Sequence, residues 1–113
     1  MNWQLLMELC DTPGIPGDDV RIDDIFRREN AHVTSEIHTD SLGNVYAHIA
    51  GAGPKVMFDA HMDEVGFLVR HIDDNGFVRV IPMGGIESKS FISQRLTILG
   101  AAQVAAVVGA TPP

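Results

Sequence analysis

The sequence predicts an α/β layer followed by a β-rich element, with the change of architecture near residue 65. Three observations support this division. Apolar residues recur at helical spacing in residues 2–10 and 18–30, whereas short apolar runs bounded by turn residues follow after residue 31. Residues 65–113 have runs at hairpin spacing and no helical pattern. With 113 residues, the chain is long enough for one domain at most.

The two predicted helices have recognisable ends. The first, residues 2–10, carries apolar side chains at helical spacing and stops at the sequence DTPGIPG, where prolines and glycines interrupt it. The second, residues 18–30, begins with two aspartates and has Arg27 and Arg28 near its end. That charge order complements the helix dipole.

The predicted strands are short and separated by turn sequences. Gly43 and Asn44 lie in one turn, and Asn75-Gly76 in another suits a tight hairpin. Residues 55–60 are apolar on both faces, which is typical of a central strand in a covered sheet. Aromatic side chains, Phe58 among them, are expected in the core. The seven predicted strands are residues 33–38, 45–49, 55–60, 65–72, 77–82, 91–99 and 103–108.

Composition and charge exclude several classes of partner. The net charge of −7 argues against nucleic acid, whose phosphates attract an excess of Lys and Arg, and against anionic membrane surfaces. No apolar run approaches the roughly 20 residues that span a bilayer. Cys10 is the single cysteine, so an intrachain disulfide is impossible and a reducing compartment is expected. We therefore expect a cytoplasmic protein.

The candidate site is the sequence AHMDE, where a polar interruption follows the predicted strand 55–60. In open α/β sheets, ligand sites gather outside the carboxyl ends of strands. A neutral imidazole such as that of His61 is a common ligand for zinc-like metals, and its other ring nitrogen needs an acceptor that fixes its orientation. Asp63 is placed to supply that acceptor. Glu64 extends the acidic character without a defined role.

Simpler interpretations stay open for these residues. A histidine and an aspartate at a strand end are common in loops. In another interpretation, His61, Asp63 and Glu64 merely bind a single adventitious metal. Asp59, inside the predicted strand, is expected to hydrogen-bond a neighbouring loop. The remaining histidines show no ligand-like spacing and are expected to be surface or structural residues; they are His32, His38, His48 and His71.

Several longer motifs resemble one enzyme family. The sequence KVMFDAHMDEVGFLVRHIDDNGFVRVIPMGG is similar to the start of the dinuclear metallo-aminopeptidases that form tetrahedral dodecamers. These are the glutamyl, leucyl and deblocking aminopeptidases, once labelled cellulase M or endoglucanase. The resemblance extends back through TDSLGNVYAHIAG and DTPGIPGDD, and forward through SFISQRLTILG to VVGATPP. It therefore covers nearly the whole chain.

The resemblance implies a fold and a chemistry. Residues 1–63 would open an α/β/α catalytic domain, and residues 64–113 would open an inserted β-barrel or PDZ-like domain that helps subunits assemble into a homo-oligomer. Both parts would be incomplete. The implied reaction removes the N-terminal residue of peptide substrates with two divalent metals, zinc or cobalt. His61 matches the first metal ligand, and Asp63 matches the aspartate that orients it.

Two departures from the family pattern bear on activity. The loop IPGDD lacks the serine and glutamate that the family more often has on either side of its glycine. The family's bridging aspartate, paired glutamates, further aspartate and last histidine have no match among these residues. We therefore expect the N-terminal portion of such an enzyme, inactive alone and holding at most one weakly bound metal. The alternative is a non-catalytic module that assembles with itself or with a full-length relative.

Overall fold

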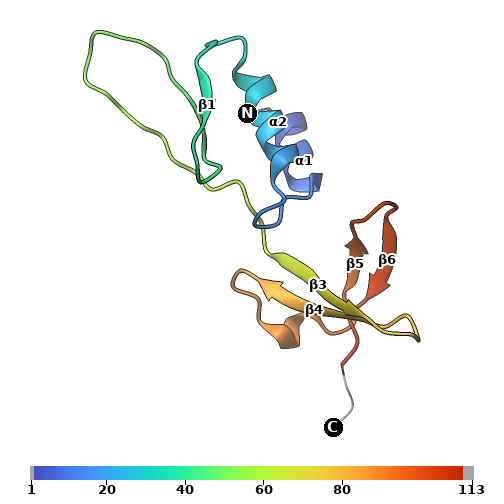
Figure 1. Cartoon of the computed structure of the whole chain (residues 1–113). Coiled ribbons are helices and arrows are strands. Elements are labelled where there is room, and N and C mark those ends of the chain that lie inside the picture. Colours follow the sequence, from blue (N-terminus) through green and yellow to red (C-terminus); the bar gives the residue numbers. More distant parts are fainter. Residues whose placement is uncertain (1, 111–113) are drawn as a thin grey trace.

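The computed structural model describes residues 2–110, arranged as an elongated molecule of 63 × 27 × 23 Å. Its radius of gyration is 18.2 Å, against about 13 Å for a compact domain of this length. Two helices and a small hairpin form one end, and two further hairpins form the other (Figure 1). A short segment leading into β3 (Gly66–Ile72) joins the two ends.

The two helices confirm the sequence prediction with small shifts at their ends. Helix α1 (Trp3–Asp11) begins after Asn2, whose side chain accepts a hydrogen bond from the backbone N–H of Leu5 at 3.2 Å. Helix α2 (Val20–Asn30) contributes Ile22 and Ile25, which are 7% and 6% exposed and form the buried apolar core of the described residues. Neither helix is long and apolar enough to cross a membrane within the described part of the chain.

The first hairpin pairs β1 (Ile37–Thr39) with β2 (Val45–Ala47) in antiparallel register. The predicted strand 33–38 begins later than expected. The reason is local, because the carbonyl oxygen of Asn30 accepts hydrogen bonds from the backbone N–H groups of Val33 and Thr34 and prolongs the turn after α2.

The predicted central strand at residues 55–60 is wrong for this structure. Residues 50–60 form an irregular, exposed loop that bulges away from the helices (Figure 1), and Phe58 is 96% exposed rather than in the core. A strand exists only through backbone hydrogen bonds to a neighbour, and no strand among residues 2–110 lies beside this one. The apolar pattern of residues 55–60 favours a strand, but the described residues supply no neighbouring strand for it to pair with.

The other end of the molecule contains two antiparallel hairpins. Strand β3 pairs with β4 (Val78–Met83) with a bulge between Val69 and His71, and β5 (Arg95–Ile98) pairs with β6 (Val104–Val107). The predicted strand 91–99 is shortened because a 3-10 turn, η1 (Ser88–Phe91), precedes it and Ser93 has a positive φ of 68°. The last three residues of the motif VVGATPP, residues 111–113, lie outside the described residues.

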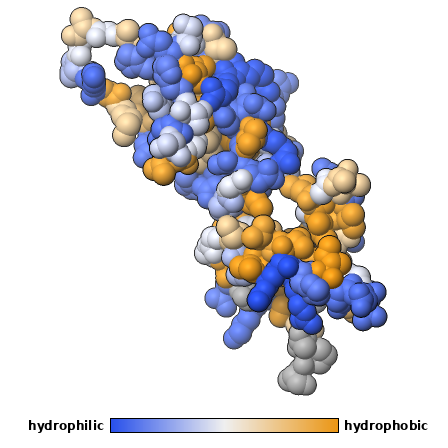
Figure 2. All heavy atoms as spheres, viewed as in Figure 1, coloured by the Kyte–Doolittle hydropathy of each residue, from blue (hydrophilic) through white to orange (hydrophobic). Residues whose placement is uncertain are grey.

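The three sheets of residues 2–110 are each two-stranded, so the structure is a mixture of helices and small antiparallel sheets. Apolar side chains gather over the half formed by β3 to β6 on the face in view, whereas the helical half is mostly polar (Figure 2). There the rings of Phe67 and Phe91 meet edge to face with centroids 5.3 Å apart. The helices-then-strands order is thus confirmed, while the closed inserted barrel and the boundary between residues 63 and 64 stay predictions.

Candidate functional site

The candidate site lies where the exposed loop 50–60 returns to the body of the molecule, just before β3. The Nδ1 atom of His61 lies 2.9 Å from the backbone carbonyl oxygen of Asp63 and 3.2 Å from its carboxylate Oδ1. Both partners are hydrogen-bond acceptors, so Nδ1 carries the proton. The Nε2 atom of a neutral His61 then has the free lone pair that a metal ligand needs.

The two side chains differ in their exposure to solvent. The side chain of His61 is 86% exposed, whereas that of Asp63 is 41% exposed. The imidazole is thus accessible to a ligand, and the aspartate is the more buried partner of the pair. This is the arrangement of ligand and orienting acceptor that the residue pattern predicted, and its role in metal binding stays a prediction.

Glu64, to which the sequence assigned no role, links this segment to the loop after α1. Its backbone N–H donates to the carbonyl oxygen of Gly14 at 2.7 Å, and its Oε1 accepts from the backbone N–H of Gly14 at 3.4 Å. Gly14 itself is buried. The two residues are 50 positions apart in the sequence, so no local pattern could have indicated the contact.

Close packing accompanies these hydrogen bonds. A Cβ added at Gly66 would lie 2.2 Å from Cγ2 of Ile15, and one added at Gly14 would lie 2.8 Å from Cγ1 of Ile22. Side chains at these two positions would therefore clash. We call the contact between the loop of residues 14–15 and the segment of residues 62–66 the clasp. Glycine at position 66 lets this segment approach Ile15, and glycine at position 14 lets the loop pack on Ile22 of α2.

The other residues considered from the sequence lie apart from the site. His48 pairs with Glu36, Nδ1 to Oε2 at 2.6 Å, and His38 packs its ring against Tyr46 with centroids 5.7 Å apart. Both are structural contacts of the first hairpin. Asp59 is exposed in the loop 50–60, and none of the side-chain hydrogen bonds of residues 2–110 involves it, contrary to the expectation.

The metal-binding capacity of the described residues is limited. Across residues 2–110, no three His, Cys, Asp or Glu side chains cluster closely enough to hold an ion together. His61 with Asp63 fits one ligand and its orienting partner, whereas a catalytic zinc takes about three protein ligands and a water. These residues therefore fit one part of a metal centre.

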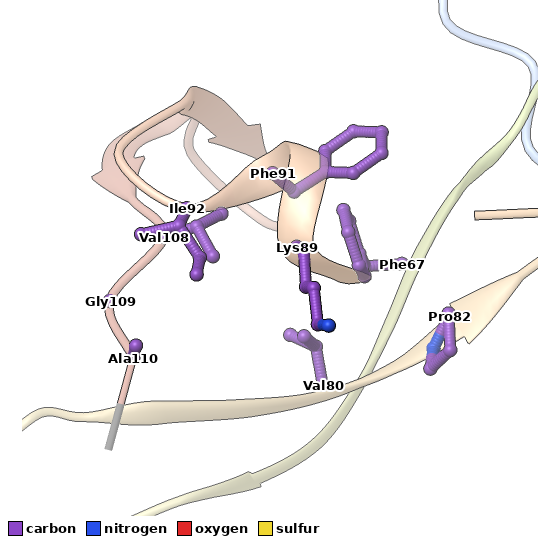
Figure 3. A pocket seen from close by; sticks show the side chains of 9 residues that line it. All are labelled: Phe67, Val80, Pro82, Lys89, Phe91, Ile92, Val108, Gly109 and Ala110. Atoms are coloured by element: carbon purple, nitrogen blue, oxygen red, sulfur yellow. The ribbon is translucent and has the colours of Figure 1, made fainter. Parts of the chain in front are cut away.

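A shallow cavity of about 330 Å³ lies in the other half of the molecule. It is lined by apolar residues of β3, β4 and η1, by Ile92 and by the segment after β6, and Lys89 lies among them (Figure 3). Phe67 and Phe91 line it together with Val80 and Pro82. It offers neither a carboxylate nor an imidazole, so it lacks the groups that acid–base or metal chemistry requires.

Comparison with known proteins connects this site to one family. The family model of the M42 glutamyl aminopeptidases matches residues 43–113, a span that includes His61 and Asp63. The lysyl aminopeptidase of Pyrococcus furiosus is 37% identical over 115 aligned residues, which cover 100% of this chain and 33% of that protein. The chain belongs to the M42 glutamyl aminopeptidase family.

Solved structures agree with the sequence match. An aminopeptidase from the archaeon Desulfurococcus kamchatkensis superposes with a TM-score of 0.85 at 30% identity, covering 97% of this chain and 32% of that one. The TET1 peptidase of Pyrococcus horikoshii, described as assembling into a tetrahedron or a large octahedral shell, gives 0.83 at 30% identity over 97% of this chain and 33% of its own. This chain spans about a third of the length of these relatives and matches their N-terminal part.

Proposed function

We propose that this chain contributes the His61 ligand segment to a two-metal aminopeptidase that removes the N-terminal residue of peptides. The observation that carries the proposal is the pair of acceptors at Nδ1 of His61, which leaves Nε2 available for a metal. In this assignment His61 binds the metal and Asp63 fixes the tautomer and orientation of the imidazole. The family match over residues 43–113 supports the reaction class.

The metals in this proposal are zinc or cobalt. When bound, two such ions would activate a water and polarise the scissile carbonyl. The other ligands and the general base are assigned to the two thirds of the relatives that this chain does not span, because no cluster of three candidate ligands occurs within residues 2–110. We therefore propose that the 113 residues alone are inactive and hold at most one weakly bound ion.

The proposal extends to assembly and location. A homo-oligomer is favoured by the Pyrococcus horikoshii relative, which forms closed shells, and by the open edges of the three two-stranded sheets. Peptides are the proposed substrates, and nucleic acid is disfavoured as a partner by the net charge of −7. The proposed location is the cytoplasm, and no membrane association is proposed.

A chimera tests this function. Residues 1–113 replace the matching third of the Pyrococcus furiosus lysyl aminopeptidase, and hydrolysis of chromogenic aminoacyl amides is measured with zinc or cobalt. We expect an active chimera, its loss of activity on His61→Ala, and little change on His71→Ala, which removes another exposed histidine. A chimera that assembles normally and keeps its activity with His61→Ala would contradict the ligand assignment.

One observation favours the alternative, a non-catalytic module that self-associates or joins a full-length relative. Among residues 2–110 the buried apolar core consists of Ile22 and Ile25, while many large apolar side chains are exposed. Sedimentation of the 113-residue chain, alone and mixed with a full-length relative, separates the two hypotheses. Stable complexes from an inactive chain, together with an inactive chimera, would favour the module.

A further inference from the structure

We infer that Glu64 is a positioning residue, which holds the His61–Asp63 pair in place through the clasp with Gly14. The inference rests on the proposed role of His61 as a metal ligand. It assigns a function to a side chain that is neither the ligand nor its orienting partner.

The first step concerns how the candidate site is attached. Between His48 and Glu64 no backbone N–H donates to another backbone group in the described structure, and residues 51–61 are all exposed. The hydrogen bond from Glu64 to Gly14 is the first anchor after that long loop. Asp63 precedes this anchor by one residue, and the His61 ring is bonded to Asp63. The position of the imidazole therefore depends on the clasp.

The second step concerns how firmly the clasp is held. Gly14 is buried against Ile22, a core residue of α2, so the acceptor and donor that it offers to Glu64 are fixed by the helix. The carbonyl oxygen of Met62 also lies close, 3.6 Å from a Cβ added at Gly14. Contacts thus run from the core through Gly14 to the segment that carries the site.

The third step separates the side chain of Glu64 from its backbone. The backbone hydrogen bond joins Glu64 to Gly14 at one point, beside the packing of Gly66 on Ile15. The longer hydrogen bond from the Gly14 N–H to Oε1, at 3.4 Å, adds a second point on the same glycine. An alanine at position 64 loses the second point. A glutamine keeps a side-chain oxygen that accepts the same hydrogen bond.

Nitrogen-15 NMR of the purified protein tests the inference without any metal. At a pH of about 8, where an ordinary histidine is neutral, the ring shifts of His61 report the fraction protonated at Nδ1. We expect Glu64→Ala to reduce that fraction and to speed hydrogen exchange at the Gly14 amide about three- to tenfold. We expect Glu64→Gln to restore both the fraction and the exchange rate. The matched control is Glu36→Ala, which removes the carboxylate partner of His48 and should leave His61 unchanged.

Each outcome has a distinct meaning. If Glu64→Ala speeds exchange at Gly14 but leaves the His61 ring shifts unchanged, the clasp forms but does not position the imidazole, and the inference is wrong. If exchange at Gly14 is also unchanged, the hydrogen bond from the Gly14 N–H to the Glu64 side chain is absent, and the inference is again wrong. Addition of cobalt(II) alone tests the proposed function separately. If cobalt leaves the ring shifts of His61 unchanged, metal binding by His61 is contradicted. The effect of Glu64→Ala on the His61 tautomer, measured without metal, decides whether Glu64 positions the imidazole.

Discussion

The guanidinium of Arg28 in α2 donates two hydrogen bonds to the carboxylate of Glu8 in α1, from Nη1 to Oε1 at 2.8 Å and from Nη2 to Oε2 at 2.6 Å. This bidentate pair joins the two helices and is the stronger geometry for arginine and carboxylate. The hydrogen bond from Arg28, opposed by desolvation, lowers the pKa of Glu8. Because both side chains are about half exposed, solvent screens the attraction.

The first prediction concerns this pair. A carboxyl whose folded pKa is lowered stabilises the fold above its unfolded pKa, and the stability is lost as pH falls through the folded pKa. We expect Arg28→Ala to lower the melting temperature modestly at pH 7. The same substitution should lower it less when the pH falls below the ordinary glutamate pKa of about 4.3. Arg21→Ala is the control, since Arg21 makes an exposed ion pair with Asp18 in the loop just before α2 and does not join the two helices. An equal effect at every pH would contradict the assignment.

The second prediction concerns Glu36 and His48 in the first hairpin. The hydrogen bond from His48 lowers the pKa of Glu36. Replacement of His48 by alanine should therefore raise the pKa of Glu36 towards its ordinary value, as followed by carbon-13 NMR titration of the carboxyl. The variant His71→Ala should leave that titration unchanged. The stability that this carboxylate contributes is present above its unfolded pKa and is lost as pH falls through its folded pKa. The free energies of unfolding of His48→Ala and His71→Ala should therefore differ least in acid.

The third prediction concerns the clasp. The Cβ of Gly66→Ala would lie 2.2 Å from Cγ2 of Ile15, so the Ile15 side chain or one of the two backbones must shift. We expect a loss of about 1–3 kcal/mol in the free energy of unfolding, measured by urea denaturation. Shortening the neighbour in the double variant Gly66→Ala, Ile15→Ala should recover part of that loss relative to Ile15→Ala alone.

A control for this prediction is Gly53→Ala. Nothing lies within 4 Å of a Cβ added at Gly53, and its φ is not positive, so its stability should change little. If Gly66→Ala were as mild as Gly53→Ala, the close packing of the clasp would be contradicted.

The fourth prediction concerns Asp63. Its replacement by asparagine keeps the shape of the side chain but weakens the acceptor at Nδ1 of His61. Loss of such an orienting carboxylate should reduce cobalt(II) affinity about 10–100-fold, measured by the visible absorption of cobalt. Asp74→Asn, an exposed aspartate in the turn after β3, is the control. Equal cobalt binding by both variants would contradict the orienting role of the Asp63 carboxylate.

Much of the local structure was predictable because it depends on short-range physics. The helices begin and end where caps, prolines and charged residues require, and the turn at Asp73 is stabilised by its own carboxylate, which accepts from the backbone N–H groups of Asn75 and Phe77. The failure at residues 55–60 has a physical reason as well. A strand needs a partner, and partners are supplied by distant residues.

The candidate site shows the same division. The sequence alone predicted the pairing of His61 with Asp63. The two residues are two positions apart, so the imidazole of one can reach the carboxylate of the other within one loop. The sequence also determined the helices and the hairpin turns. Only the tertiary structure decided that Glu64 meets Gly14 across 50 positions, that Gly66 packs on Ile15 with no room for a side chain, and that Phe58 is left exposed. These features depend on which backbones approach one another in space, and no local pattern encodes that approach.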